Sequence, residues 1–262
     1  MNLKIKVLDL GNMTFYKNEL IKTDNENEMI VSPSYAILIQ HPAIGNVLYD
    51  TGNDDSWDET YSDDMKRIYP ITKLTTIKEA LQKEGLTPSD IDLLILSHLH
   101  FDHVGGLKYF SGTKAGKKVL AYEHELKDAF YKVNIAENGI CGAYMRPLFC
   151  NLSGIGFLPI NDETELANGL TLFIQRCHTA GVIGLKIDLK NEGTVIFCGD
   201  TIYTKESYDR EIGPGGGINK TDAEFHENLS MIKEMKQKFN AQIFFGHDIK
   251  QTNEWQNRGW ID

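Results

Sequence analysis

The sequence contains the stretch Ser97-His98-Leu99-His100-Phe101-Asp102-His103-Val104-Gly105-Gly106, in which three histidines and one aspartate fall within six positions. Directly before it comes the apolar run Ile91-Asp92-Leu93-Leu94-Ile95-Leu96. This run is too short for a typical helix and is apolar on both faces, so it predicts a buried strand that delivers the cluster into a loop. Imidazole nitrogens and carboxylate oxygens together suit zinc and neighbouring transition metals. The stretch therefore predicts a metal site at the end of a strand.

The alternative is that these histidines are ordinary core or surface residues. A lone histidine usually is, but three of the chain's eight histidines stand together here with an acid among them. Partly buried imidazoles without partners would cost free energy. Gly105 and Gly106 suggest a backbone with unusual dihedrals or a close approach, although a simple turn would also explain them. We therefore favour the metal site.

Length and composition are those of an ordinary globular protein, with 262 residues, 41% hydrophobic and 24% charged. We expect a single domain over residues 1–262. The net charge of -10 repels polyanions, so nucleic acid is not an expected partner. No run reaches transmembrane length, and the amino terminus lacks the apolar core of a signal peptide. We expect a cytoplasmic protein without a membrane partner; the sequence sets no oligomeric state.

The four cysteines are Cys141, Cys150, Cys177 and Cys198. They show no C-x-x-C spacing and no secretion signal accompanies them, so free thiols are expected. Cys177 and Cys198 each stand close to a candidate metal ligand, which leaves a coordinating role open for them.

Hydrophobic periodicity predicts a chain of strands and helices. Apolar and alternating runs predict strands over residues 3–10, 30–40, 47–49, 91–96, 117–122, 170–174, 185–189, 194–197 and 241–245. Helical spacing predicts a helix over 74–86 that Gly85 ends. The polar segment 22–28 is expected to be a solvated loop.

Two histidines outside the cluster are expected on the surface. His124 stands at the start of a helix predicted to begin near Glu123. His226 follows a capping box of Thr221 and Glu224 that opens a further helix, and it lies off the apolar stripe of that helix.

Residues 125 to 160 are rich in aromatic residues and glycine and show little regular periodicity. We favour a hydrophobic cluster separate from the main core. The alternative is one wall of an apolar substrate pocket, since methionine and aromatic side chains often line such pockets.

Four candidate ligands stand just past the ends of predicted strands, namely His98, His178, Asp200 and His247. If these strands share sheets, their ends converge at one edge and assemble a site that no local segment could build. Asp50, in the turn after the strand at 47–49, is then a candidate to orient a ligand imidazole.

Seven candidate ligands are more than one tetrahedral zinc ion can use: His98, His100, Asp102, His103, His178, Asp200 and His247. Two ions are the natural count, with three histidines on one ion, two histidines and Asp102 on the other, and Asp200 bridging both. Such a pair lowers the pKa of a bound water to near 7 and so supplies a nucleophile. Two zinc ions are the expected cofactor, and iron, manganese or cobalt suit the same ligands.

At these residues the sequence resembles the metallo-β-lactamase superfamily. The set His-x-His-x-Asp-His, followed by a distant His, Asp and His, is that superfamily's dinuclear signature, and the similarity spans nearly the whole chain. Within it, residues 199–206 and 244–249 resemble the N-acyl homoserine lactonases. The resemblance implies an α/β fold, a four-layer αββα sandwich with the site at the edge of its two sheets. It also implies a zinc hydrolase that opens lactone rings and so interferes with bacterial signalling (quorum quenching).

The resemblance also implies a catalytic role for Tyr203, and the chemistry of ring opening suggests one for Asp102. Tyr203, three residues after Asp200, would hydrogen-bond the lactone during ring opening, since a phenol is a neutral donor. Asp102 would carry a proton to the leaving alkoxide. The alternative for Tyr203 is simple packing beside the site.

The chain departs from the lactonase pattern around the fifth histidine. Lactonases commonly carry Gly-His-Thr-Pro-Gly-His there, whereas this chain has Cys177-His178-Thr179-Ala180-Gly181-Val182. The alternative function is therefore another hydrolase of the superfamily, acting on a thioester, another lactone or a phosphodiester. A metal-binding protein without turnover is a further alternative.

Overall fold

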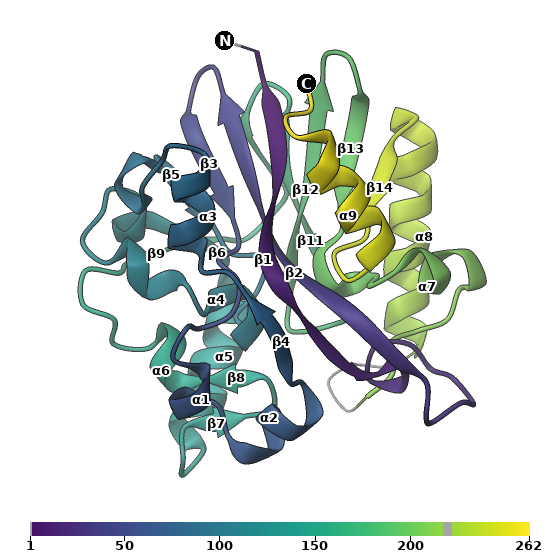
Figure 1. Ribbon diagram of the computed structural model, residues 1–262. Helices are drawn as coiled ribbons and strands as arrows, with labels where there is room; N and C mark the ends of the chain where they lie inside the picture. Colours follow the sequence, from purple (N-terminus) through teal and green to yellow (C-terminus); the bar gives the residue numbers. More distant parts are fainter. Residues whose placement is uncertain (1, 217–221) are drawn as a thin grey trace.

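The computed structural model describes residues 2–216 and 222–262, in which two β-sheets pack face to face (Figure 1). The larger sheet has seven strands in the order β4-β1-β2-β3-β5-β6-β9. Strands β1 to β3 pair antiparallel, and β3, β5, β6 and β9 run parallel. Their bounds are β1 (Lys4–Tyr16), β2 (Met29–His41), β3 (Gly45–Tyr49), β4 (Ile71–Leu74), β5 (Leu93–Ile95), β6 (Val119–Tyr122) and β9 (Phe157–Ile160).

The smaller sheet has five strands in chain order, β10-β11-β12-β13-β14. Their bounds are β10 (Thr164–Ala167), β11 (Leu170–Gln175), β12 (Val182–Leu189), β13 (Gly193–Phe197) and β14 (Gln242–Phe244). Because β11 and β13 both pair antiparallel with β12, and β14 runs parallel to β13, three of these strands end at the same edge of the sheet. A separate two-stranded ribbon joins β7 (Ile140–Cys141) to β8 (Tyr144–Met145).

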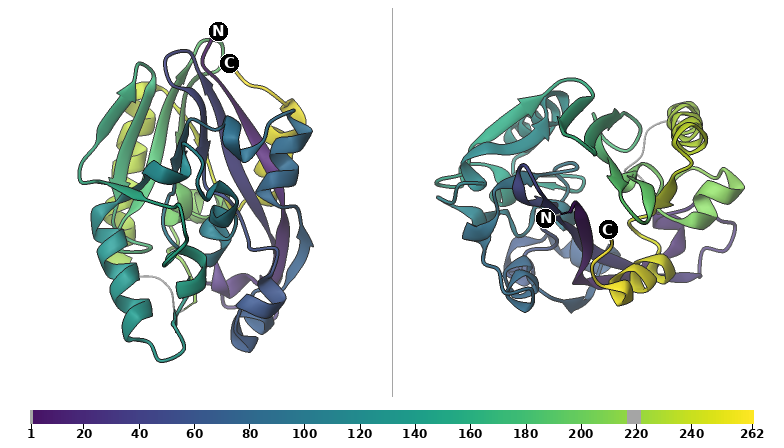
Figure 2. Two further views of the ribbon diagram at one scale, coloured as in Figure 1. Left: turned by 90° about the vertical axis from the view of Figure 1, so that its left-hand side faces the viewer. Right: turned by 90° about the horizontal axis from the view of Figure 1, so that it is seen from above.

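Helices cover the outer faces of both sheets, with α3 and α5 on one side and α8 on the other (Figures 1 and 2). The described helices are α1 (Trp57–Thr60), α2 (Asp63–Ile68), α3 (Ile77–Lys83), α4 (Phe101–Val104), α5 (Glu123–Ile135), α6 (Arg146–Phe149), α7 (Lys205–Arg210), α8 (Asp222–Phe239) and α9 (Ile249–Arg258). One core lies between the sheets, and a further core lies under the helices on each outer face. The expected four-layer αββα architecture is confirmed.

The inner core draws apolar side chains from both sheets. Ile37 and Val47 of the larger sheet pack with Leu172 and Leu185 of the smaller one, and all four are fully buried. The Tyr49 hydroxyl donates a hydrogen bond to the Ile183 carbonyl across the gap, at 2.6 Å. Burial of apolar surface on both sides therefore fixes how the sheets face each other, and with it how their edges meet.

The predicted strands are present with shifted ends, and one helix begins later than predicted. Leu74 was expected in the helix over 74–86, but it ends β4, where it pairs with Gly11 of β1. The helix α3 begins after Thr76, whose side chain forms a capping box with Glu79. Gly85, with φ +73°, follows the end of α3 as predicted.

The segment 125–160 does not form a separate cluster, so that expectation is wrong. It folds into α5, the β7–β8 ribbon and α6, and its side chains Tyr144, Met145 and Phe149 belong to the large core under the seven-stranded sheet. The irregular periodicity reflects these short elements, which are too short to repeat an apolar pattern.

Among the described residues, no helix has the length and apolar character needed to cross a membrane. The four cysteines all lie within the described residues and form no disulfide. Of the predicted capping box, Glu224 lies in α8, whereas Thr221 falls outside the described residues. Helix α8 buries Phe225 and Leu229 as its apolar stripe predicts.

Candidate metal centre

The histidine-rich stretch follows β5 of the larger sheet. His98 and His100 lie in the loop after the strand, as predicted, but Asp102 and His103 lie on the one-turn helix α4 instead of a loop. A Cβ at Gly105 would lie 2.1 Å from the amide nitrogen of Asp54. The glycine that ends α4 thus permits the close backbone approach that the sequence suggested.

The other three candidate ligands come from the smaller sheet. His178 follows β11, Asp200 follows β13 and His247 follows β14, which are the strands that end at one edge. The predicted convergence of strand ends is therefore observed. All seven candidate ligands fall into two adjacent groups whose ligand atoms lie within 4.8 Å of one another inside each group.

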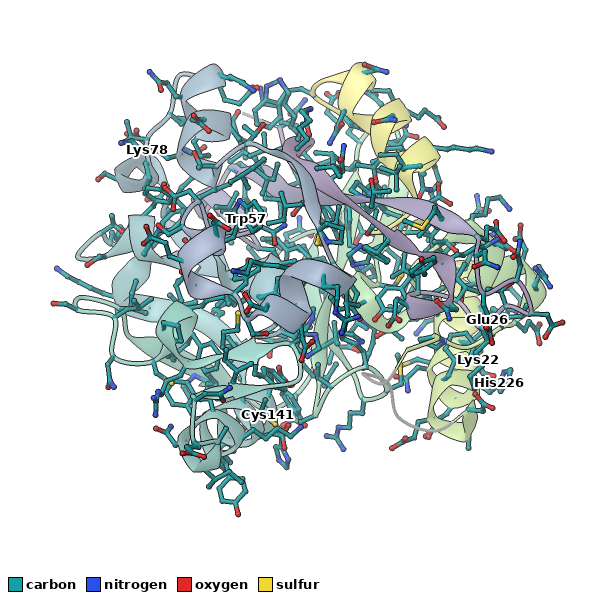
Figure 3. All side chains as sticks on the ribbon, turned by 60° about the horizontal axis from the view of Figure 1, so that its bottom comes forward. Lys22, Glu26, Trp57, Lys78, Cys141 and His226 are labelled. Atoms are coloured by element: carbon teal, nitrogen blue, oxygen red, sulfur yellow. The ribbon has the colours of Figure 1, made fainter. Side chains whose placement is uncertain are left out.

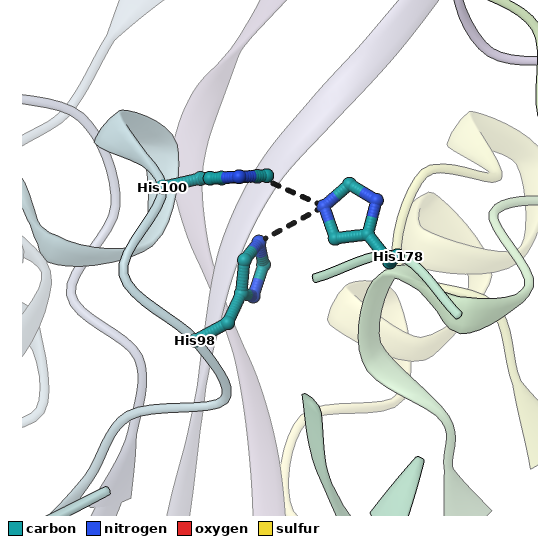
Figure 4. A group of neighbouring side chains, drawn as sticks. All are labelled: His98, His100 and His178. Carbon is teal, nitrogen blue, oxygen red and sulfur yellow. Dashed lines mark hydrogen bonds between the residues drawn. The ribbon is translucent and has the colours of Figure 1, made fainter. Parts of the chain in front are cut away.

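One group, the three-histidine cluster, consists of His98, His100 and His178 (Figure 4). Nε2 of His178 lies 3.2 Å from Nε2 of His98 and 2.9 Å from Nδ1 of His100. One ring nitrogen carries at most one proton, so it cannot donate to two neighbours at once. Nitrogens bound to one tetrahedral zinc lie roughly 3.3 Å apart, since each Zn–N bond is about 2.0–2.1 Å. The geometry fits a shared cation.

The other group, the mixed cluster, consists of Asp102, His103, Asp200 and His247. Nε2 of His103 lies 3.3 Å from Oδ1 of Asp200 and 3.7 Å from Oδ2 of Asp102. Both carboxylate oxygens of Asp200 lie 3.1 Å from Nε2 of His247. Among the described residues, Nε2 of His103 is buried without a hydrogen-bond partner. An orphaned buried nitrogen facing carboxylates is the arrangement that a cation completes.

Asp200 connects the two clusters. Besides its contacts in the mixed cluster, its Oδ2 lies 3.5 Å from Nε2 of His178 and 3.8 Å from Nε2 of His98. The carboxyl group is nearly fully buried. A carboxylate with one oxygen available to each cluster is suited to bridge two ions, as the sequence predicted.

The pKa values of His98 and His100 in one cluster and of His103 in the other are shifted in opposite directions. Burial lowers the pKa of His98 and of His100 well below the usual value, which keeps both rings in the neutral form that binds metals. Burial also acts to lower the pKa of His103, but the carboxylates of Asp200, Asp102 and Asp50 raise it well above the usual value. The carboxylates of the mixed cluster thus favour a positive charge beside His103, whether of a proton or of a metal ion.

The outward ring nitrogens of the ligands have polar partners. Nδ1 of His103 lies 2.8 Å from the buried Asp50 carboxylate, which is the contact expected if Asp50 orients this ring. Nδ1 of His247 lies 2.6 Å from the Ser32 hydroxyl. Such partners fix the orientation and tautomer of a ligand ring. Sequence reasoning missed Ser32 because a serine within the strand pattern of β2 carries no signal of its own.

Tyr203 lies against both clusters. Its hydroxyl is 2.9 Å from Nδ1 of His178, and its ring packs edge to face on His247 with centroids 5.1 Å apart. Burial and the charge of Asp200 raise the pKa of Tyr203 well above the usual value, so the phenol stays neutral. Tyr203 also lines the pocket beside the clusters.

That pocket has one wall of candidate ligands and another made by the amino-terminal hairpin. The hairpin wall consists of Met13, Phe15, Glu19 and Leu20, and Tyr69 and Phe101 complete the apolar lining. The Glu19 carboxylate accepts a hydrogen bond from the Tyr69 hydroxyl at 3.2 Å. Ala143, from the aromatic segment, reaches the same pocket, so that segment also contributes to a pocket wall.

The remaining candidates lie apart from the clusters. Sγ of Cys198 contacts the carbonyl oxygens of Ile202 and Phe244 at 3.5 Å, and neither Cys177 nor Cys198 belongs to the two ligand groups found in the described residues. His124 is exposed and stacks on Tyr122, and His226 lies exposed at the outer edge of α8 (Figure 3). The surface positions predicted for both histidines are confirmed.

Comparison with known proteins adds independent findings. The sequence model of the metallo-beta-lactamase superfamily matches residues 29–247. The chain is 27% identical over 256 residues to an N-acyl homoserine lactonase of Bacillus cereus, a match that covers 95% of this chain and 94% of that protein. It is 26% identical to the N-acyl homoserine lactonase AiiB of Agrobacterium fabrum, over 96% of this chain and 95% of that protein.

Solved structures share the fold. An N-acyl homoserine lactone hydrolase with the product N-hexanoyl-L-homoserine bound at its catalytic metal centre superposes with a TM-score of 0.82, 24% identity and 97% coverage of both chains. AidC, a dizinc quorum-quenching lactonase, superposes with a TM-score of 0.68 and 16% identity, over 94% of this chain and 88% of that one.

Proposed function

This chain belongs to the metallo-beta-lactamase superfamily, and we propose that it is a metal-dependent hydrolase that opens the ester ring of N-acyl homoserine lactones. The observation that carries this proposal is Asp200, which faces both ligand clusters beside a pocket. Structural metal sites are closed by protein ligands, whereas seven ligands shared between two ions leave positions open for water and substrate. Open positions favour catalysis over a purely structural role.

The residues fit a pair of divalent ions, which we propose to be zinc. His98, His100 and His178 would hold one ion, His103, His247 and Asp102 would hold the other, and Asp200 would contact both. The neutral rings of the first cluster and the orphaned Nε2 of His103 support this division. When bound, such ions supply a nucleophilic water at neutral pH and polarise an ester carbonyl.

Tyr203 is proposed to donate a hydrogen bond to the substrate. With Nε2 of His178 bound to an ion, its Nδ1 would carry the ring proton and donate to the Tyr203 oxygen at 2.9 Å. The phenol's own proton is then free to point into the pocket, and the raised pKa of Tyr203 keeps that proton in place. A neutral donor beside the clusters suits an ester oxygen on which negative charge develops.

Asp102 is proposed to move the proton that ring opening requires. Its side chain is the most exposed of the carboxylates at the clusters, and it lines the pocket. Its Oδ2 lies 3.7 Å from Nε2 of His103, so one oxygen can face the ligands while the carboxyl group still reaches the substrate side. A carboxylate in that position can take a proton from the attacking water and return it to the leaving alkoxide.

We also propose the compartment, the domain structure and the partners of the protein. We infer that residues 1–262 form one domain, because the core between the sheets draws on both halves of the chain. The four cysteines form no disulfide, which supports the cytoplasm as the compartment. The net charge of -10 supports a small-molecule partner over nucleic acid.

The deciding experiment is a pH-monitored hydrolysis screen of zinc-loaded protein with metal content measured on the same sample. The substrates are acyl homoserine lactones of several chain lengths, simple lactones, thioesters and phosphodiesters. We expect rapid opening of acyl homoserine lactones with two ions bound. Two bound ions with turnover only of thioesters or phosphodiesters would keep the dinuclear hydrolase and reject the substrate. Two bound ions without any turnover would reject an enzyme.

A further inference from the structure

Glu125 is a fully buried carboxylate that the proposed reaction does not use. It lies in the first turn of α5, and its Oε1 accepts two hydrogen bonds, from the Leu99 amide at 3.1 Å and from the Tyr144 hydroxyl at 2.9 Å. Its Oε2 is buried without a hydrogen-bond partner among the described residues. Burying a carboxyl group costs free energy, so its retention at this place calls for a physical reason.

Each contact of Glu125 leads to the three-histidine cluster. Leu99 stands between His98 and His100, so its amide fixes the backbone that carries both ligands. The Tyr144 ring packs against the His100 ring with centroids 4.6 Å apart. The Thr179 side chain lies close to the same carboxyl group, and Thr179 directly follows His178. One side chain thus joins the two segments that carry the cluster.

The carboxyl group acts here as a hydrogen-bond acceptor more than as a charge. Burial raises the pKa of Glu125 to about 7, although its hydrogen bonds act to lower it. The two observed hydrogen bonds both end on Oε1, an atom that a glutamine amide also offers. Glutamine would place its amide nitrogen where Oε2 lies and keep this acceptor.

We propose that Glu125 is the positioning residue of the three-histidine cluster: it holds the loop at Leu99, the Tyr144 ring and the segment at Thr179 so that three imidazoles converge on one ion. This inference rests on the proposed two-ion site. It means that a side chain that is not itself a ligand contributes to the affinity of the three-histidine cluster for its ion. Partners that orient ligands in this way typically contribute about 10- to 100-fold to metal affinity.

The test compares metal-free wild type, Glu125→Leu and Glu125→Gln, each titrated with Zn²⁺ against a competing chelator. Spectra that correlate histidine ring protons with ring nitrogens identify which imidazoles bind at each step. We expect Glu125→Leu to bind the ion of His98, His100 and His178 about 10- to 100-fold more weakly, with the other ion unchanged. Glu125→Gln should stay within about threefold of wild type, because it restores the acceptor.

Thermal unfolding of the metal-free proteins separates positioning from general packing. Equal weakening of both ions together with a large loss of metal-free stability would overturn the proposal, and so would wild-type affinity in Glu125→Leu. Weakening in Glu125→Gln as large as in Glu125→Leu would reject the acceptor role. If wild type itself binds fewer than two ions, the proposed function fails first, which distinguishes the two failures.

A matched pair of variants covers the case in which Glu125→Leu does not fold. Tyr144→Phe deletes the hydroxyl that bonds Glu125, and Tyr109→Phe deletes a hydroxyl that bonds a different carboxylate, Asp55, outside the pocket. We expect Tyr144→Phe to weaken only the ion of the three-histidine cluster, by roughly 3- to 10-fold, the size of one lost hydrogen bond. Tyr109→Phe should leave the affinity of both ions unchanged. Equal metal binding in the two variants would contradict the proposal.

Discussion

The three-histidine cluster and the mixed cluster lie side by side, yet the protein holds them by different means. In the mixed cluster a buried carboxylate, Asp50, contacts the His103 ring directly, and the Ser32 hydroxyl contacts His247. In the three-histidine cluster neutral hydroxyls contact the rings, Ser97 on His98 and Tyr203 on His178, and the buried carboxylate of Glu125 bonds the backbone at Leu99 instead. A carboxylate thus acts on a ring in one cluster and through the backbone in the other, so the two proposed ions should respond to different substitutions.

Replacement of the residue that both clusters share should have the largest effect. Asp200→Asn keeps the volume of the side chain but removes the charge between the clusters. Since residues behind a ligand contribute about 10- to 100-fold, loss of a bridging ligand should lower kcat/KM by more than about 100-fold and reduce metal content below two ions. Metal analysis and lactone hydrolysis measure both. Two ions retained at wild-type affinity would show that Asp200 does not bridge.

Tyr203→Phe should separate catalysis from metal binding. The variant keeps the ring against His247 and removes only the hydroxyl. Loss of one donor to a developing negative charge lowers the rate by about 10- to 1000-fold. We expect that decrease in kcat while both ions remain bound. An unchanged rate would leave Tyr203 with a packing role, and loss of the ion at His178 would make it a partner of the ligand instead.

Asp50→Asn should weaken metal binding at the mixed cluster, as Glu125→Leu should at the three-histidine cluster. Asparagine tolerates the left-handed backbone at this position, where φ is +64°, so the loop is retained. Without the carboxylate on Nδ1, the His103 ring becomes a weaker ligand. We expect the ion of the mixed cluster to bind about 10-fold more weakly and the other ion to be unaffected, in the same chelator titration. Loss of both ions together would abolish the distinction between the clusters.

The smallest expected effect is a pH dependence of stability that comes from Glu125. Burial raises its pKa from 4.5 to about 7, so the folded protein holds this proton more tightly than the unfolded chain does. The resulting stabilisation is full below about pH 4.5 and is lost as the pH rises through about 7. Between pH 6 and pH 8 the metal-free wild type should lose roughly 1 kcal/mol relative to Glu125→Gln. Denaturant unfolding at both pH values measures it, and parallel pH profiles would contradict it.

The comparison also explains what the sequence could predict. Ligand types and their places after strands are local properties, so His98, His178, Asp200 and His247 could be predicted from apolar runs that end in polar residues. Asp50 could be predicted because it follows the same rule. These features depend on periodicity, which needs no knowledge of distant contacts.

Residues that position the candidate ligands but do not follow the end of a strand could not be predicted from the sequence. Ser32 lies 215 positions before His247, and Glu125 reaches Leu99 from 26 positions away. Nothing in a buried serine or a glutamate at a helix start distinguishes it from a solvated residue until the fold brings its partner close. Strand β4 could not be predicted for a similar reason. Its four residues form a strand because they pair with the edge of β1, and their own pattern carries no strand signal.

The pocket wall formed by Met13, Phe15 and Leu20 comes from a hairpin that supplies no candidate ligand. Over generations, this part of the gene can accumulate changes that alter which acyl group fits, while the segments that carry the candidate ligands stay under separate selection. Laboratory evolution can use the same separation between the pocket wall and the segments that carry the candidate ligands. A library confined to Met13, Phe15 and Leu20 would explore new substrates and leave the candidate ligands and Ser32 in place.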